Sequence, residues 1–586
     1  MNNNKTKMHS FAKGAVILTF GMLTVKILGA AFKIPLMSVL GGEGSGYFTG
    51  AYNLYNPIYA LATAGLPIAV SKVVSENYAL GKFRDIRKLR KISMPIFLIT
   101  GTIGFILIIF GAFVYANFAK APGAIYSIFM LAPTLFFSCL MSTYRGYYEG
   151  LRNMTPTAVS EVIESFGKVI FGLSFAHFTI WSGQNEFNNY GTIFGKLCLN
   201  LIEAEGRLLQ FASASAVAGI AISAMLGFFY MFLRYKLKGD DLNELSILKS
   251  PEAQSSKKLL KDLIKVAAPV GLGAIVMNLA GVIDSVLIQR RLAHAAVFSL
   301  SRLASVYGNL LPEDVITRGN IHIFLAGCFG FTTTITMFLP TISQGIAIST
   351  LPTITAAWAL KKEMKKNVEK IIKFTSIISI PMGFGLSALA LPVMDLVYNT
   401  FRSGMQASEV KIGAGIMAIS GIAAVFTALS TPVCSMLQAI GRADLPVKII
   451  SIGVVIKIIL NYILVGIPEI NIQGAGIGTL ACYIVVFASS IVFLCKITKI
   501  KLDFVSTFLK PLISGLICAA SAYIFYKIFS IMFNSKISTI LSIIASAIIY
   551  FVSIFLFRTF DISELESFPI VSKFAKFFKK IKNINS

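Results

Sequence analysis

The stretch Phe11–Leu40, FAKGAVILTFGMLTVKILGAAFKIPLMSVL, is apolar over a length that can cross a bilayer as an α-helix, for which about 20 residues suffice. It nevertheless carries Lys26 and Lys33 well inside it. A lysine at the centre of a membrane helix costs roughly 2.5–3.5 kcal/mol on insertion scales, so such a residue normally faces a cavity, a partner charge or a ligand. The two lysines lie two helical turns apart and therefore on one face. We expect this face to line a cavity through which an anionic group passes.

The composition places the whole chain among the polytopic membrane proteins. Of its 586 residues, 55% are hydrophobic and only 14% are charged. The formal net charge is +26, but the Lys and Arg residues lie in short segments between apolar runs, so we expect no nucleic-acid partner. The seven cysteines lack the paired spacing of zinc or redox sites. We therefore expect buried thiols and no metal or other cofactor.

Apolar runs of about 20 residues predict an all-α fold with about fourteen transmembrane helices. They lie near 12–39, 50–71, 93–116, 124–143, 157–180, 212–233, 265–288, 322–351, 374–398, 412–437, 449–467, 474–495, 506–530 and 537–557. An even number of spans places both termini on one side. Segments 72–91 and 234–265 are rich in Lys and Arg, whereas the alternate loops 41–52 and 466–474 contain neither. By the positive-inside rule, both termini are cytoplasmic.

An internal repeat divides the spans into two similar bundles. Gly21 and Gly29 recur as Gly273 and Gly281, and further pairs recur downstream. Each copy holds about six spans, an even number, so the copies have parallel topology, and substrate sites in such carriers lie near the midplane between the repeats. The predicted parts are an N-terminal six-helix bundle at 1–235, a cytoplasmic linker at 236–263, a C-terminal six-helix bundle at 264–497, two additional transmembrane helices at 498–558 and a basic amphipathic cytoplasmic tail at 559–586.

The longer connections are predicted from their periodicity. Segments 182–211 and 289–321 repeat apolar residues at helical spacing, which predicts amphipathic helices on the outer surface. The tail 559–586 surrounds an apolar face with lysines and is expected to bind anionic membrane lipid. The run Gly41–Gly46 lacks the Lys-Ser/Thr pair of a phosphate-binding loop and is interpreted as a flexible outer turn.

Two charged faces in the first bundle are candidate substrate contacts. Lys26 and Lys33 have no carboxylate in their own span, which favours contact with a substrate phosphate; the alternative is an ion pair with Glu161, Glu164 or another acid across the bundle. Lysine suits a diphosphate that must be released again. Glu161, Glu164 and Lys168 share one face of span 157–180. Glu164 and Lys168 can form a purely structural pair, or this face can be a mixed-charge wall of a hydrated cavity.

The second bundle differs chemically from the first. In the repeat, Asn278 stands where Lys26 stands in the first copy, and we count it with the substrate contacts. Asp284 could bind a coupling cation or pair with Lys457, which would then replace that cation, and Asn461 could add an oxygen to either arrangement. The coupling source is correspondingly open between sodium, protons and the membrane potential.

Motifs of covalent catalysis are weak throughout. The four histidines show no metal-ligand spacing, and neither a nucleophile elbow nor a Walker sequence is present. We expect a carrier rather than an enzyme. A polyprenyl-phosphate glycosyltransferase would need a catalytic acid or metal-binding carboxylates on a large outer loop, and neither 182–211 nor 289–321 offers a convincing set.

Several motifs of the first half resemble a known group. They are the Lys13-Gly14 pair with Lys26-Ile27-Leu28-Gly29, then GLPIAVSK at 65–72, ALGK at 79–82, YRGYYEG at 144–150 and MTPT at 154–157. Together they resemble the polysaccharide-transporter and stage V sporulation protein B group of Gram-positive bacteria. That group is related to the peptidoglycan lipid II flippase within the multidrug, oligosaccharidyl-lipid and polysaccharide exporter superfamily. The resemblance covers spans one to twelve and is most specific from 13 to 160.

The resemblance implies a fold, a substrate class and a location. It implies two six-helix bundles plus two C-terminal helices beside a groove for a polyprenyl tail, in a bacterial cell membrane. It also implies an undecaprenyl-diphosphate-linked glycan as substrate, with Lys26 on its headgroup and Lys33 as a near match to a second contact, and cell-wall synthesis proteins as partners. Flippases of the Gram-negative type carry further arginines in spans two and eight, whereas 50–71 and 322–351 contain no Arg or Lys. The exact glycan, and a role in growth or in sporulation, therefore stay open, and the main rival is a cation-coupled multidrug exporter.

Overall fold

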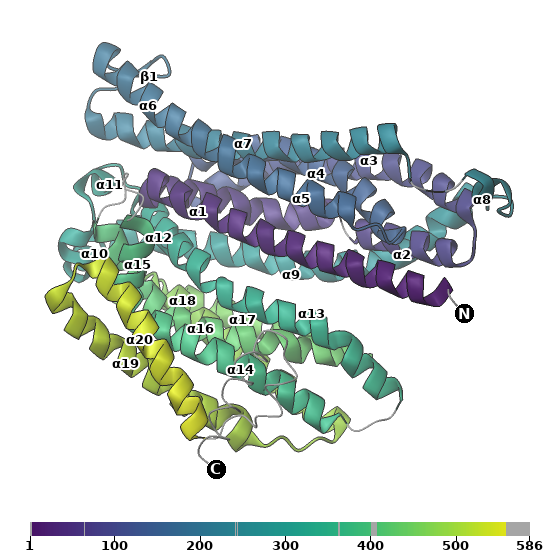
Figure 1. The fold of residues 1–586 in the computed structure, drawn as a ribbon. Coiled ribbons are helices and arrows are strands. Elements are labelled where there is room, and N and C mark those ends of the chain that lie inside the picture. Colours follow the sequence, from purple (N-terminus) through teal and green to yellow (C-terminus); the bar gives the residue numbers. More distant parts are fainter. Residues whose placement is uncertain are drawn as a thin grey trace. The chain divides into compact units, whose positions relative to one another are not determined.

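The computed structural model describes residues 3–63, 65–240, 242, 244–360, 364–399 and 407–557. Over these ranges the protein is built of helices, with one two-stranded β-hairpin and connecting loops (Figure 1). Eleven stretches among the described residues are long and apolar enough to cross a membrane, by length and composition. The predicted all-α polytopic membrane fold is confirmed.

The elements follow one another along the chain as consecutive long helices with short connections. The first half contains α1 (Asn3–Thr63), α2 (Leu66–Ala79), α3 (Phe83–Ala119), α4 (Ala124–Gly150), α5 (Thr155–Gly167), a π-helix (Lys168–Gly172), α6 (Leu173–Tyr190), β1 (Thr192–Ile193), β2 (Lys196–Leu197), α7 (Leu201–Lys238), α8 (Glu244–Leu248), α9 (Ser256–Phe298), α10 (Leu300–Tyr307), a 3₁₀ turn (Gly308–Leu310) and α11 (Glu313–Thr317). The second half contains α12 (Ile321–Thr336), α13 (Phe338–Ala359), α14 (Lys365–Ala388), α15 (Ala390–Tyr398), α16 (Ala407–Ala439), α17 (Asp444–Leu464), α18 (Gln473–Thr498), a π-helix (Val505–Leu509), α19 (Lys510–Met532) and α20 (Ser535–Leu556).

Contacts divide the chain into two compact units. Unit 1 comprises Met1–Thr334, Phe401–Ile412 and Ile458–Ile472, and unit 2 comprises Ile335–Thr400, Gly413–Lys457 and Gln473–Ser586. These units follow spatial contacts, whereas the predicted bundles 1–235 and 264–497 follow the sequence repeat. The division into bundles, linker and additional helices stays a prediction.

Helix α1 is a hairpin of two antiparallel arms, 3–40 and 42–63. The turn is Gly41, whose φ of 59° lies in the region that glycine adopts without strain. Ser45 donates a hydrogen bond to the carbonyl of Met37 at 3.5 Å, although eight residues of straight helix rise about 12 Å. The rings of Phe32 and Phe48 lie 6.4 Å apart for the same reason. The predicted turn is therefore confirmed at Gly41, but it is shorter than the glycine run, because Gly42, Gly44 and Gly46 are helical. Its place on the outer side stays a prediction.

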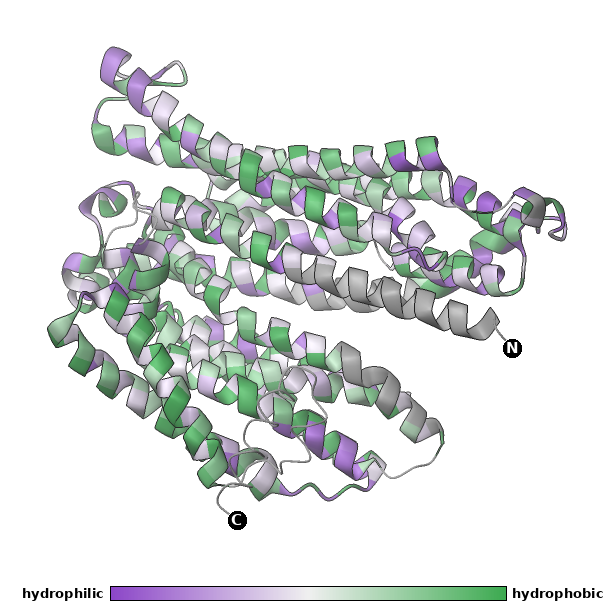
Figure 2. Ribbon diagram, viewed as in Figure 1, coloured by the Kyte–Doolittle hydropathy of each residue, from purple (hydrophilic) through white to green (hydrophobic). Residues whose placement is uncertain are grey.

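The fourteen predicted spans are compatible with these helices. The two arms of α1 supply two spans, and α5, the first π-helix and α6 follow one another without a break. Helix α9 covers the run predicted at 265–288. The long helices are hydrophobic over most of their length, and hydrophilic residues gather near ends such as those at β1 and α8 (Figure 2). The exact number of spans stays a prediction.

The connection at 182–211 differs from its prediction. Helix α6 continues to Tyr190, and the short β-hairpin then turns through Phe194 (φ 47°) and Gly195 (φ 76°). Glu186 fixes this turn, because its carboxylate accepts the backbone N–H groups of Gly195 at 2.9 Å and Phe194 at 3.0 Å. The N–H of Gly195 and the Thr192 hydroxyl lower the pKa of Glu186. A separate amphipathic helix is therefore wrong here, since the apolar residues belong to the ends of two helices and to the hairpin.

The second long connection, 289–321, contains a short amphipathic helix as predicted. This is α10, in which Leu303 and Tyr307 are buried while Ser301, Arg302 and Ser305 are exposed. Its place on the outer surface stays a prediction. The predicted amphipathic tail 559–586 lies outside the described residues.

In unit 2, the two C-terminal helices are attached through α14. Gly515 of α19 lies against Ile380 of α14, where a larger residue would clash. The Tyr550 hydroxyl of α20 donates to the carbonyl of Ile377 at 2.6 Å. Because α19 also packs along α20, the three helices form one layer of this unit.

Candidate functional site

Lys26 and Lys33 lie on the first arm of α1. Lys26 is exposed and Lys33 is half-buried. Gly29 stands between them on the same face, and a Cβ added there would meet no atom within 4 Å. Among the residues that the structure describes, no carboxylate lies within ion-pair distance of either lysine. This face thus presents two ammonium groups beside open space.

The first arm packs along α5 and the π-helix that follows it. Gly21 lies against Ala158 near the start of α5, and Phe32 lies against Gly172 at the end of the π-helix. Both helices run in the same direction between these contacts. Along the helix axes, Lys26 on the first arm and Glu164 and Lys168 on the other helix therefore all lie between these two contacts.

A compact charge cluster joins α4 and α5. Lys168 Nζ lies 2.7 Å from Glu164 Oε1, and Arg145 Nη2 lies 3.2 Å from Glu164 Oε2. Arg145 also donates from Nε to the Ser160 hydroxyl at 2.9 Å. The cluster is mostly buried, with about 15% of the Glu164 side chain exposed. Glu164 therefore binds two cations at once, and in the described part of the chain Glu161 on the same helix has no ion pair within 4 Å.

Tyrosines of the second arm of α1 face this cluster. The rings of Tyr52, Tyr55 and Tyr59 form a ladder with centroid separations of 5.9 and 5.6 Å. Tyr52 interacts electrostatically with Lys168, and Tyr59 with Arg145. Tyrosine hydroxyls can donate to an anion, and the rings can contact sugar or cation faces. The ladder adds hydrogen-bonding groups to the charges of α4 and α5.

The polar residues predicted for the second bundle are partly brought together. Asn461 of α17 is fully buried and donates from Nδ2 to Asp284 Oδ1 of α9. The remaining oxygen of Asn461 has no hydrogen-bond partner among the described atoms. Asn278 is half-buried on α9, nearly two turns before Asp284. Lys457 belongs to unit 2, and its pairing with Asp284 stays a prediction.

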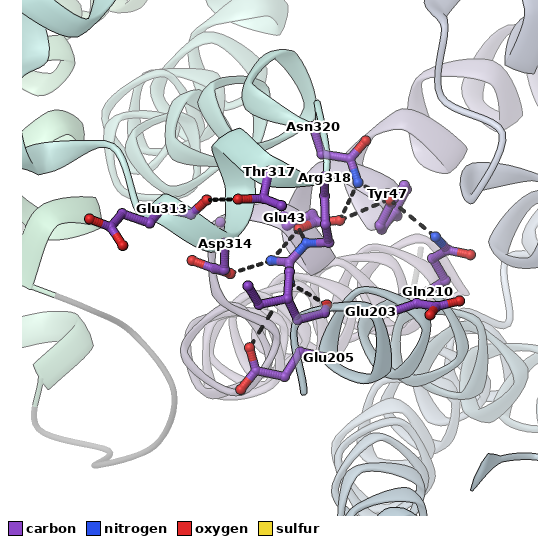
Figure 3. Close-up of polar contacts among 12 residues, drawn as sticks. Glu43, Tyr47, Glu203, Glu205, Gln210, Glu313, Asp314, Thr317, Arg318 and Asn320 are labelled. Carbon is purple, nitrogen blue, oxygen red and sulfur yellow. Dashed lines mark hydrogen bonds and ion pairs between the residues drawn. The ribbon is translucent and has the colours of Figure 1, made fainter. Parts of the chain in front are cut away.

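A third polar cluster in unit 1 was not predicted. Arg318, which follows α11, donates from Nε to Glu43 Oε2 at 3.1 Å and from Nη1 to the carbonyl of Ile202 at 2.8 Å (Figure 3). Asn320 donates to Glu43 Oε1 at 2.7 Å, and the Tyr47 hydroxyl donates to the same oxygen at 3.0 Å. Both oxygens of the buried Glu43 carboxylate are thus engaged.

Sequence reasoning missed Arg145, the tyrosine ladder and the cluster of Glu43 and Arg318. The tyrosine spacing of i, i+3 and i+7 was a visible signal for one helical face. Arg145 stood in the YRGYYEG motif, but its partner Glu164 lies on another helix. Glu43 lies in the glycine run 41–46, whose sequence predicts a turn and gives no signal of a buried partner.

Comparisons with known proteins agree with this architecture. Residues 11–358 match the family model described as polysaccharide biosynthesis protein, and residues 324–463 match the MatE model. "Lipid II flippase MurJ" of Bacillus subtilis is 27% identical over 482 residues, 80% of each chain. "Stage V sporulation protein B" of the same organism is 23% identical over 580 residues, 96% of this chain and 98% of that one.

Two solved structures share the fold. One is titled "Lipid II flippase MurJ, inward closed conformation", with a TM-score of 0.57 and 15% identity over 92% of this chain and 98% of that one. The other is an inward-facing multidrug resistance MATE family transporter, with a TM-score of 0.57 and 17% identity over 83% of this chain and 99% of that one. Because the first family model spans more than half of the sequence, the chain belongs to the polysaccharide biosynthesis protein family.

Proposed function

We propose that this multi-pass membrane transporter is a flippase for an undecaprenyl-diphosphate-linked cell-wall precursor, with lipid II as the preferred candidate. It moves the headgroup from the inner to the outer leaflet by alternating access and performs no covalent chemistry. The relative named as a lipid II flippase supports this substrate class, and the relative named as a stage V sporulation protein supports a role in sporulation.

The observation that carries the proposal is the face of Lys26, Gly29 and Lys33. Two lysines in a membrane-length helix have no carboxylate partner in the described part of the chain, and Gly29 leaves open space between them. A diphosphate would satisfy both ammonium groups and offset their desolvation. Sodium-coupled drug export would instead require acidic groups on such a face.

The charge cluster of α5 supplies the opposite wall in this proposal. Arg145 and Lys168 are both engaged by Glu164, so they can bind an anion by exchanging one hydrogen bond rather than by ordering free side chains. The tyrosine ladder offers hydroxyls to the sugar. On α20, Ile540, Ile544, Ile548 and Phe551 form an exposed apolar stripe, which suits a polyprenyl tail that stays in lipid.

Replacing Lys26 tests the proposal. The Lys26→Ala variant should fail to support growth of a strain that lacks its own lipid II flippase, while its membrane level and thermal stability remain those of the parent. Lys26→Arg should restore part of the function, since it keeps the charge. Lys236→Ala, which removes an exposed lysine at the end of α7, is the matched control. If the Lys26→Ala protein supports growth as well as the control, the proposed substrate contact is wrong.

The multidrug exporter of the same fold is separated by a second measurement. A flippase makes lipid II accessible to an outer-surface reagent without exporting dyes, whereas a drug exporter does the reverse. Native mass spectrometry of the purified protein identifies the lipid that it carries. The cytoplasmic placement of both termini, and the partnership with anionic lipid and cell-wall synthesis proteins, belong to this proposal.

A further inference from the structure

The cluster around Arg318 joins segments that are far apart in the sequence. Glu43 and Tyr47 belong to α1, Ile202 and Gln210 belong to α7, and Arg318 lies in the connection before α12. Every one of these residues lies in unit 1. In the sequence repeat, however, α1 and α7 belong to the predicted N-terminal bundle and Arg318 belongs to the C-terminal one. The cluster therefore ties the two predicted bundles together beside Gly41, where the two arms of α1 meet.

The tie is polar and buried. About 10% of the Arg318 side chain and 2% of the Glu43 side chain are exposed, and their closest nitrogen and oxygen lie 2.9 Å apart. Arg318 also pairs with Asp314, and Glu205 lies 4.0 Å away. Tyr47 is itself contacted by the amide of Gln210 at 3.5 Å (Figure 3). One arginine thus faces three carboxylates, of which Glu43 is buried, so removal of the arginine would leave the Glu43 charge buried without its cation.

Further contacts between the same two parts of the sequence surround this tie. The backbone N–H of Gly42 donates to Glu409 Oε1 at 2.5 Å. The ring Nε2 of His322 lies 2.8 Å from the carbonyl of Lys120. Tyr115 donates to Gln289 at 3.1 Å, and Asn53 donates to Ser285 at 2.7 Å. These bonds are individually modest, and their groups can bind water when they separate.

The backbones also approach very closely here. Gly327 of α12 crosses α1 at Gly42, and Gly46 faces the carbonyl of Ile323, so a side chain at any of these glycines would clash. Small residues allow helices in membranes to meet at such crossings. The crossing is nevertheless packed, because the buried side chains of Phe324 and Ile323 lie over Gly42 and Gly46, and opening it must separate them from α1.

We propose that Glu43 and Arg318 form a latch that closes the outer end of the transporter and that must separate before the substrate is released. This inference deepens the proposed function and rests on it for the identity of the released substrate. The latch concerns only whether the outer end of the transporter is closed. It can therefore be tested without any lipid substrate.

The test measures access from the outside to a residue below the latch. Thr49 lies past Tyr47 on the second arm of α1, and its hydroxyl is buried against Gly330. A Thr49→Cys reporter, in a protein whose native cysteines are replaced, is treated in intact cells with a membrane-impermeant maleimide. Lys249→Cys on the predicted cytoplasmic side should stay unlabelled and checks the sidedness.

Glu43→Gln and Arg318→Met should each raise the labelling rate of the reporter by roughly tenfold or more, because the closed state loses its buried ion pair. Arg318→Lys should have a smaller effect, since it keeps the charge but loses the bidentate fork. Glu203→Gln is the matched control, because it breaks a neighbouring pair with Arg207 that lies outside the latch. Its labelling rate should equal that of the reporter alone.

Unchanged labelling in both latch variants would overturn the proposal. If Glu43→Gln or Arg318→Met fails to accumulate in the membrane, Arg318→Lys and Glu43→Asp decide: an increase in labelling supports the latch, and parental rates overturn it. Failure of the proposed function has a different signature. In that case the latch variants still open, but neither they nor the parent change the outer accessibility of lipid II.

Discussion

Glu164 balances two cations in the interior of unit 1. Its two oxygens bind Lys168 one turn away on the same helix and Arg145 on α4. The first of these pairs follows from local spacing and was foreseen. The second pair depends on the packing of α4 against α5. One ion pair of Glu164 is therefore set by spacing within a helix, and the other is set by packing between two helices.

Removal of Glu164 should destabilise the protein by about 3–5 kcal/mol, because two largely buried cations lose their partner. The expected result for Glu164→Gln is a clear fall in melting temperature in detergent, measured by tryptophan or dye fluorescence. Adding Lys168→Met to this variant should restore part of the loss, since one unpaired cation is then gone.

Glu161→Gln is the control for this experiment. Glu161 lies on the same helix and has no ion pair within 4 Å in the described part of the chain. It should melt near the parental temperature. Equal destabilisation by both changes would show that the ion pairs of Glu164 with Arg145 and Lys168 contribute nothing specific to stability.

At the scale of elements, the connection between α7 and α9 is fixed to the start of α3. Arg87 binds Asp240 at 3.0 Å and Glu244 at 2.7 Å. Arg84 donates to the carbonyls of Ile247 and Leu248 at the end of α8. The segment predicted as a linker at 236–263 therefore contains a short helix held at both ends. This contact would limit how far the linker moves during transport.

The pairing with Arg87 predicts a pH dependence. Burial alone would raise the pKa of Asp240, but the hydrogen bonds and charge of Arg87 outweigh it, so the pKa lies below its ordinary value. A lowered folded pKa means that the stabilisation is complete above the unfolded value of about 3.9 and is lost as the pH falls through the folded value. The contact is therefore fully formed at neutral pH.

Arg87→Met should loosen the linker by roughly 1–3 kcal/mol, because it leaves the buried carboxylate of Asp240 without its cation. Hydrogen exchange of residues 244–250 should speed up at pH 7 relative to the parent. Lys91→Met, an exposed neighbour on α3, should leave the exchange unchanged. The difference between Arg87→Met and the parent should shrink as the pH falls below about 4. A difference that persists unchanged in acid would assign the protection to other contacts.

At the scale of the whole molecule, the open question is what drives transport. Asp284 is bonded to Asn461, and one Asn461 oxygen is buried without a hydrogen-bond partner among the described atoms. The two interpretations of Asp284 predict opposite responses to sodium. If Asp284 binds the ion, sodium chloride should raise the melting temperature relative to choline chloride. Binding at 100 times the dissociation constant raises the free energy of unfolding by about 2.7 kcal/mol.

In that case Asp284→Asn abolishes the sodium response, and Lys457→Met leaves it in place. If Lys457 replaces the cation, the parent shows no sodium response, and Lys457→Met creates one. Melting temperatures of the purified protein, measured in sodium chloride and in choline chloride at the same concentration, distinguish these results. A sodium response that survives Asp284→Asn would exclude both interpretations.

The sequence by itself determined the membrane class, the all-α fold and the groups that share one helix face. These follow from local rules: apolar length sets a span, and residues three, four or seven apart lie on one face. Lys26 with Lys33 and Glu164 with Lys168 were found in this way. The wrong interpretation at 182–211 and the turn predicted too long at 41–46 both concern chain reversals, where a short hairpin or one glycine decides the local structure.

Only the tertiary structure decided which faces meet. Arg145 reaches Glu164, Glu43 reaches Arg318 and Asn461 reaches Asp284 across long stretches of chain. No local pattern encodes such pairs, because the meeting of two helices depends on the packing of all the helices between them. The paired lysines of α1 could therefore be recognised from the sequence, but the latch beside the reversal of the same helix could not.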